Sequence, residues 1–176
     1  QIATINPSFV IGPIMSKNTF TSAEIIERIM NGKLPHIPRV SFGLVDVRDV
    51  ATAHLLALEN PNSNGRRYIV CDKTMWMVDL AAVLRGEFKP QGYNISVSQV
   101  GKCPVKFLSL FDKQAKLIVK DIGINYRYDN SRSTNELKLK YTPTEKSLVD
   151  MGYSLIEKGV IKDKRKSKQP KPDSAQ

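Results

Sequence analysis

The sequence has few cysteines and no long apolar run. Its 176 residues include only two cysteines, Cys71 and Cys103, which excludes a disulfide-stapled secreted scaffold. Their spacing is not that of a metal-binding pair, and we expect a reducing, cytoplasmic compartment. Apolar stretches last only a few residues, whereas a membrane-spanning helix needs about 20. We therefore expect no membrane span.

Several patterns that carry chemistry are also missing. The ten glycines are scattered with no Gly-x-Gly pair, so the sequence lacks the turn that brings a dinucleotide pyrophosphate to a helix N-terminus. No tyrosine is followed by a lysine four residues later. His36 and His54 have no second ligand at metal spacing, which excludes a zinc site. We therefore predict no catalytic residue and no metal ligand in this chain.

The positive charge is unevenly distributed. The formal net charge is +10, and residues 162–176 carry six basic and two acidic side chains, so a net +4 lies in this segment. The segment is rich in Lys, Pro, Ser and Gln and is too polar to bury a core, which predicts a basic disordered tail after a folded region of residues 1–161. Solvated terminal charge explains the excess, and we do not expect a nucleic-acid partner.

Strand-like and helix-like patterns alternate along the body of the chain. Thr21-x-x-Glu24 is a capping box ahead of apolar residues at helical spacing, and Asp46 or Asp49 can cap a second helix. The patterns predict an interior strand over 2–11, a helix over 21–31, a strand over 40–47, a helix over 49–60, a strand over 67–71 and a helix over 78–86. This alternation predicts an α/β fold with parallel, buried strands.

The second half gives weaker signals. Residues 93–100 predict another strand, and Pro104 can open a helix. Two further capping boxes, Ser133-x-x-Glu136 and Thr142-Pro143-x-Glu145, predict helix starts, the second leading into a helix that Gly159 ends. These patterns predict the fold class but do not indicate which reaction, if any, the protein catalyses.

Five segments, taken in order, resemble a known family. They are NPSFVIGP at 6–13, VDVRDVATAHLLALE at 45–59, GRRYIV at 65–70, YDNSRSTNEL at 128–137 and SLVDMGYSLIEKG at 147–159. Together they are similar to the extended short-chain dehydrogenase/reductases, in the branch of dihydroflavonol reductase, cinnamoyl-CoA reductase and fungal aldehyde/ketone reductases. One departure is Lys138, which stands where the family usually has a glycine after leucine.

The resemblance implies that this chain is the C-terminal half of such a reductase. It would hold the last strands and helices of a Rossmann-type sheet and a small α/β substrate-binding domain. The glycine-rich turn and the catalytic Tyr/Lys pair would lie in a missing N-terminal half, and the absent initiator Met fits a fragment or a processed chain. The chain alone is therefore expected to be inactive, and its oligomeric state is left open.

The resemblance also assigns sites. It implies NADP, or NAD, as cofactor and a small-molecule carbonyl substrate, with nicotinamide-side contacts from Pro7, Ser8, Val10 and Ser22 and pocket contacts from Ile14, Met15 and Phe20. It gives Asp49 the role of helix cap and Arg48 a buried ion pair. Without the resemblance, Pro7 ends a strand ladder and Ser22 contributes to the cap of its helix.

Two other functions remain open. The parent protein could be a nucleotide-sugar epimerase or dehydratase, although the apolar Gly-Pro-Ile-Met segment at 12–15 favours a less polar substrate. It could also be a non-catalytic relative that uses the fold as a binding or assembly module.

Overall fold

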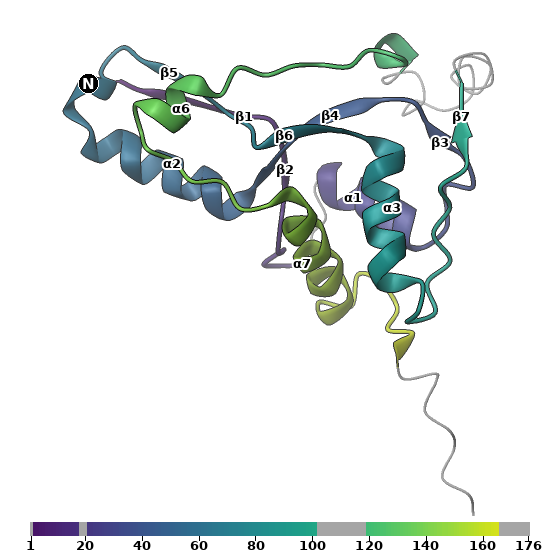
Figure 1. Ribbon diagram of the computed structural model, residues 1–176. Helices are drawn as coiled ribbons and strands as arrows, with labels where there is room; N and C mark the ends of the chain where they lie inside the picture. The colour runs from purple at the N-terminus through teal and green to yellow at the C-terminus, as the bar shows by residue number, and fades with distance from the viewer. Residues whose placement is uncertain (1, 18–20, 102–118, 166–176) are drawn as a thin grey trace, which may run out of the picture.

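The computed structural model describes residues 2–17, 21–101 and 119–165. Strands and helices alternate along most of this length (Figure 1). The strands are β1 Thr4–Pro7, β2 Phe9–Ile11, β3 Ile37–Pro38, β4 Ser41–Asp46, β5 Arg67–Val70, β6 Lys73–Trp76 and β7 Gln99–Val100. The helices are α1 Thr21–Met30, α2 Val47–Glu59, α3 Met77–Phe88, α6 Ser131–Asn135 and α7 Thr144–Glu157, with 3-10 turns at Pro61–Ser63 and Val119–Asp121. The predicted α/β class is confirmed.

The first strand segment changes its partner halfway. β1 pairs in parallel with β5, β2 pairs in parallel with β4, and β4 continues the sheet through antiparallel β6. A single residue, Ser8, joins β1 to β2. The interior strand predicted over residues 2–11 is therefore two short strands, each with one partner among the described residues. The sequence also gave no signal for β6.

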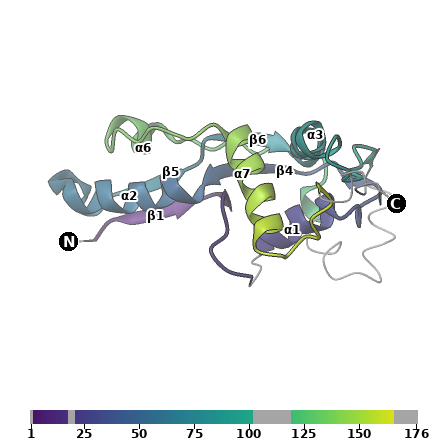
Figure 2. The same ribbon diagram turned by 90° about the horizontal axis from the view of Figure 1, so that it is seen from below.

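Two cores lie on either side of this change of partner. The larger core packs α1, α3 and α7 against β2 and β4, with Ile26, Met30, Leu84, Phe88 and Leu148 fully buried. The smaller one packs α2 against β1 and β5. Figures 1 and 2 show α2 toward one end of the molecule and α1 and α3 toward the other, with α7 between them. Ala53 and Ala57 face Tyr68 and Val70 there, and their small side chains let α2 lie close to the strands.

The predicted capping boxes of the second half are wrong. α6 begins at Ser131, and Ser133 lies inside it, donating its hydroxyl hydrogen bond to the backbone carbonyl of Ile69 at 2.9 Å. α7 begins at Thr144 with no side-chain cap, because the hydroxyl of Thr142 donates to Asp49 instead. The position of α7 was predicted, but its start is held by two carboxylates distant in sequence, Asp49 on Thr142 and Asp72 on Thr144.

The remaining predictions concern the second half of the chain and its end. The strand predicted over 93–100 is confined to Gln99–Val100, and the helix predicted from Pro104 lies outside the described residues. The predicted tail boundary at 161 precedes four described residues, and the backbone carbonyl of the first, Lys162, accepts a hydrogen bond from Tyr93 Oη at 3.1 Å. Among the described residues, no helix is both long and apolar enough to cross a membrane.

Gly152 allows the closest contact between α7 and its neighbours. A Cβ added there would lie 2.6 Å from the Phe88 ring and 3.2 Å from the Met30 sulfur. Because Phe88 is fully buried and cannot yield, Gly152→Ala is expected to lower the free energy of unfolding by about 1–3 kcal/mol. Gly86→Ala in α3 is the control. Apart from its own helix backbone and chain neighbours, no atom of the described residues lies within 4 Å of a Cβ added there, and this substitution should stabilise by about 0.5–1 kcal/mol. Urea unfolding of both variants checks this, and equal effects would contradict it.

Lys138 has a left-handed backbone conformation. Its φ is 57°, the one positive φ of a non-glycine residue in the described ranges, and the next amide, of Leu139, donates to the Ser133 carbonyl at 3.1 Å. A lysine side chain is strained in this conformation. Lys138→Gly is therefore expected to raise the free energy of unfolding by about 0.5–1 kcal/mol in thermal melts. Lys140→Gly, where φ is not positive, should give no such gain.

Candidate functional site

The carboxyl ends of β1 and β5 meet where the sheet divides. The Ser8 amide donates to the Val70 carbonyl at 3.0 Å, and its hydroxyl lies 3.3 Å from the same oxygen. Two residues after Val70, beyond the end of β5, the Asp72 amide donates to the Leu44 carbonyl of β4 at 2.8 Å. Ligands of open α/β sheets bind outside the carboxyl ends of parallel strands, at such points of divergence. We call this place, formed by Pro7 and Ser8 and by the chain from Val70 to Asp72, the seam, and we take it as the candidate site.

Pro7 lies exposed at the seam. The amides of Thr4 and Ser8 donate to β5, to the carbonyls of Arg66 and Val70. Because backbone groups of a parallel strand alternate between its two edges, those of Ile5 and Pro7 turn to the opposite edge. Proline has no N–H, so no donor is left unsatisfied there. The site thus presents an apolar ring and a backbone carbonyl at the strand end.

Cys71 forms the buried wall of the seam. Its side chain is 2% exposed, and burial raises the pKa of the thiol above its ordinary value. Asn130 donates to the Cys71 carbonyl at 2.7 Å, and a Cβ on Gly43 would lie 2.9 Å from the sulfur. A neutral, enclosed thiol is a poor nucleophile, so Cys71 serves as a small apolar packing residue.

The other residues assigned by the resemblance lie on separate elements. Val10 is half-buried in β2, opposite Val45, and Ser22 lies in the first turn of α1, a helix that packs against β2. The Ile14 amide donates to Ser154 Oγ at 3.0 Å, whereas the side chain of Met15 is 93% exposed. Phe20 lies outside the described residues.

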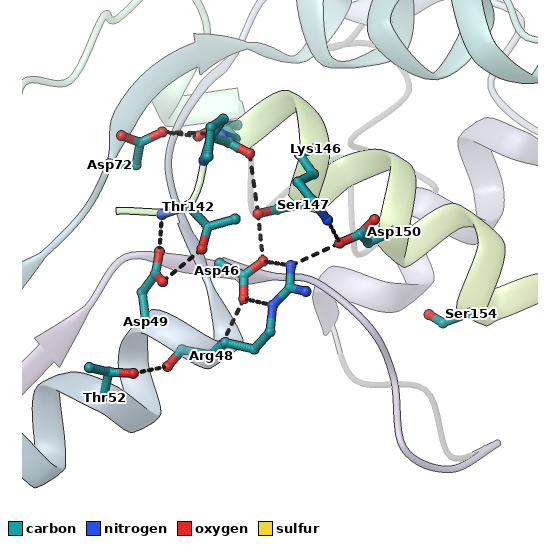
Figure 3. A network of polar contacts seen from close by, with 12 residues as sticks. Asp46, Arg48, Asp49, Thr52, Asp72, Thr142, Lys146, Ser147, Asp150 and Ser154 are labelled. Carbon is teal, nitrogen blue, oxygen red and sulfur yellow. Dashed lines mark hydrogen bonds and ion pairs between the residues drawn. The ribbon is translucent and has the colours of Figure 1, made fainter. Parts of the chain in front are cut away.

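A buried carboxylate joins β4, α2 and α7 beside the seam (Figure 3). Asp46 caps α2 by accepting from the Arg48 amide at 2.7 Å. It also accepts from Arg48 Nε at 2.8 Å, Arg48 Nη2 at 2.6 Å and Ser147 Oγ at 2.5 Å. Arg48 Nη2 reaches Asp150 of α7 at 2.9 Å. Both oxygens of Asp46 accept hydrogen bonds from Arg48 or Ser147, and the charge of Arg48 is balanced by Asp46 and Asp150. We therefore read this network as one that stabilises the fold.

The helix-cap role expected for Asp49 is wrong. Asp46 occupies the cap position, and the buried Asp49 accepts from the Thr142 amide at 2.7 Å and from its hydroxyl at 2.9 Å. The expected ion pair of Arg48 exists, although the arginine side chain itself is 46% exposed. Sequence reasoning missed Ser147 and gave Thr142 a local capping role, because only the packing of α7 brings them to these carboxylates. No three His, Cys, Asp or Glu side chains of the described part are grouped to hold a metal ion.

Removing the charge of Asp46 should destabilise the fold. Burial alone would raise its pKa, but the hydrogen bonds from Arg48 and Ser147 outweigh burial and hold the pKa below the ordinary value. Asp46→Asn is expected to cost about 2–4 kcal/mol of unfolding free energy, against less than about 1 kcal/mol for Asp150→Asn, whose side chain is 26% exposed. Chemical unfolding at pH 7 measures both, and similar losses would contradict the central role of Asp46.

The same carboxylate gives a pH dependence. Its lowered pKa in the folded state adds stability above the unfolded-state pKa of about 3.9, and this contribution is lost as pH falls through the folded-state value. Between pH 5 and 2, the Asp46→Asn variant should therefore lose less stability than the unmodified chain. Parallel loss would show that Asp46 does not contribute.

Comparison with known proteins places these features in a family. No protein-family profile matches the chain. It is 32% identical to a cinnamoyl-CoA reductase of Medicago truncatula over 158 residues, which are 90% of this chain and 42% of the relative. It is 34% identical to the NADPH-dependent methylglyoxal reductase of Saccharomyces cerevisiae over 107 residues, 57% of this chain and 31% of that protein. The chain thus spans less than half the length of these curated relatives.

Solved structures of reductases superpose on this chain as well. The yeast methylglyoxal/isovaleraldehyde reductase, solved with NADPH, superposes with a TM-score of 0.67 at 27% identity, covering 88% of this chain and 43% of the other. A vestitone reductase from alfalfa superposes with a TM-score of 0.65 at 20% identity over 90% of this chain and 45% of its own, and shows the shared fold. The chain is therefore similar to a C-terminal part of the extended short-chain dehydrogenase/reductases, in the branch of cinnamoyl-CoA and methylglyoxal reductases.

Proposed function

We propose that this chain supplies the nicotinamide side and part of the substrate pocket of an NADPH-dependent reductase that acts on the carbonyl of a small organic substrate. The observation that carries the proposal is the meeting of Pro7, Ser8 and the end of β5 at the carboxyl ends of two parallel strands. One relative supports NADPH as the cofactor, since the yeast methylglyoxal reductase is named NADPH-dependent and was solved with NADPH.

The residues at the seam fit one end of such a cofactor. A nicotinamide ring is flat and carries an amide group, and it would meet the exposed ring of Pro7 and a backbone carbonyl that the strand leaves at its outer edge. Ser8 Oγ already has the Val70 carbonyl as partner, so Ser8 shapes the seam through its backbone. Bound NADPH would supply a hydride. The residues of this chain position the ring and exclude water from one side of it.

The loop after β2 is the proposed substrate side. Ile14 anchors it, through its amide on Ser154 and its side chain against the larger core. Met15 follows with nearly its whole side chain in solvent, and a flexible thioether suits contact with an apolar substrate. The acid that protonates the carbonyl oxygen would come from the part of the relatives' length that this chain does not cover. We therefore propose that the chain alone does not catalyse the reduction.

NADPH oxidation tests the proposal. The 176-residue chain should give no absorbance change at 340 nm with NADPH and methylglyoxal or cinnamoyl-CoA, because it contains no glycine-rich turn and no Tyr-x-x-x-Lys pair. The product of the complete reading frame should oxidise NADPH with a carbonyl substrate. Turnover by the chain alone, or none by the complete product with any of a panel of aldehydes and ketones, would overturn it.

A substitution locates the cofactor. In the complete product, Pro7→Phe should raise KM for NADPH about tenfold or more, because the larger ring fills the space at the strand end. Thr4→Phe, at the other end of the same strand and also exposed, is the matched control and should leave KM unchanged. Equal KM values for both variants would remove Pro7 from the site.

A further inference from the structure

An open groove lies along the C-terminal half of α3. The chain turns after the helix at residues 89–92 and returns beside it toward β7 (Figure 1). The groove has a volume of about 600 Å³ and is lined by Ala82, Arg85, Gly86, Lys89, Pro90 and Val97. This volume is in the range of small-molecule sites, which is about 300–1,000 Å³.

The surface of the groove is mainly apolar. Ala82, Gly86 and Pro90 are exposed and follow one another at intervals of four residues, and the half-buried Val97 of the returning chain lines the groove with them. Apart from its own helix backbone and chain neighbours, no described atom lies within 4 Å of a Cβ added to Gly86, so the groove is open at this residue. An apolar body that covered this surface would gain free energy by removing it from water.

Two cations lie in the same groove without an acid beside them. Arg85 and Lys89 are one helical turn apart, so their charges repel each other. Neither side chain has an ion pair among the described residues, and none of the described residues that line the groove is an Asp or a Glu. Glu87 of the same helix is bonded to Tyr153 instead. The helix C-terminus adds only about half a negative charge, and the groove therefore stays positive.

A neighbouring hollow has its charge balanced from within the chain. It has a volume of about 440 Å³ and is lined by Pro90, Gln91, Tyr153 and Arg165. Arg165 donates from Nε and from Nη2 to Asp163, each at 2.9 Å. Arg85 and Lys89 have no such counterpart in the described part of the chain, so the anion that balances them must come from solution.

We propose that the groove binds a small, freely diffusing organic anion that carries a carboxylate on an apolar body. The carboxylate would lie between Arg85, whose planar guanidinium can donate two hydrogen bonds to it, and Lys89, which adds a point charge. The apolar body would cover Gly86 and Val97. Both ribbon views place α3 away from β1 and β5 (Figures 1 and 2), so this site is separate from the seam and does not rest on the proposed function.

Titration with decanoate tests the site. Calorimetry on the 176-residue chain should show one site that binds decanoate at least about tenfold more tightly than decanol, which lacks the charge, or acetate, which lacks the apolar body. Amide chemical shifts should change at Gly86 and Val97 and stay constant at Ser8. No saturable binding below about 5 mM, equal affinity for decanol, or shifts centred on Ser8 would overturn the proposal.

A pair of double variants tests the charge. Arg85→Gln with Lys89→Gln should weaken decanoate binding about tenfold and leave decanol binding unchanged. Arg66→Gln with Arg67→Gln is the matched control, because it removes the same charge from two exposed residues at the start of β5. Its affinity should equal that of the unmodified chain. Equal losses in the two double variants would show general attraction to a basic protein and would overturn the site.

A single variant tests the shape of the groove. Gly86→Leu fills the space beside the two cations, and decanoate should then bind at least about tenfold more weakly. Because leucine is a better helix former than glycine, the melting temperature should not fall, and a loss of binding cannot come from unfolding. Unchanged affinity in this folded variant would overturn the assignment of the groove.

Discussion

The buried carboxylate of Asp46 is the contact on which the arrangement of the molecule depends. It ends β4, caps α2 and accepts from Ser147 of α7, so one side chain fixes a strand and two helices. α7 packs in the larger core and α2 in the smaller one, and the carboxylate is therefore a buried polar link between them. A buried charge is tolerated because Arg48 donates to Oδ1 and both Arg48 and Ser147 donate to Oδ2.

The change of partner at Ser8 sets the position of the candidate site. β1 follows β5 and β2 follows β4, so the sheet opens where the two pairings separate. Pro7 is suited to this place because it has no N–H, so the strand end leaves no unsatisfied donor at this residue.

The helices could be predicted in advance and many of their contacts could not. The apolar spacing after Thr21 gave α1 to within one residue, and the pattern before Gly159 located α7. The capping boxes at Ser133 and Thr142 failed because both hydroxyls have tertiary acceptors, the Ile69 carbonyl and the Asp49 carboxylate. Lys138 was recognised as a departure from the family, yet it keeps the left-handed turn that glycine would make.

The sequence by itself determined the α/β class, the order of the main elements and the family, since helical period, strand composition and short motifs are properties of neighbouring residues. Tertiary structure alone decided that Asp46 caps α2 in place of Asp49, that the first strand divides at Ser8, and that Ser147 completes the carboxylate's hydrogen bonds from 101 positions away. The physical reason is that a buried polar group takes whichever partner packing brings within reach, and local sequence does not specify that partner.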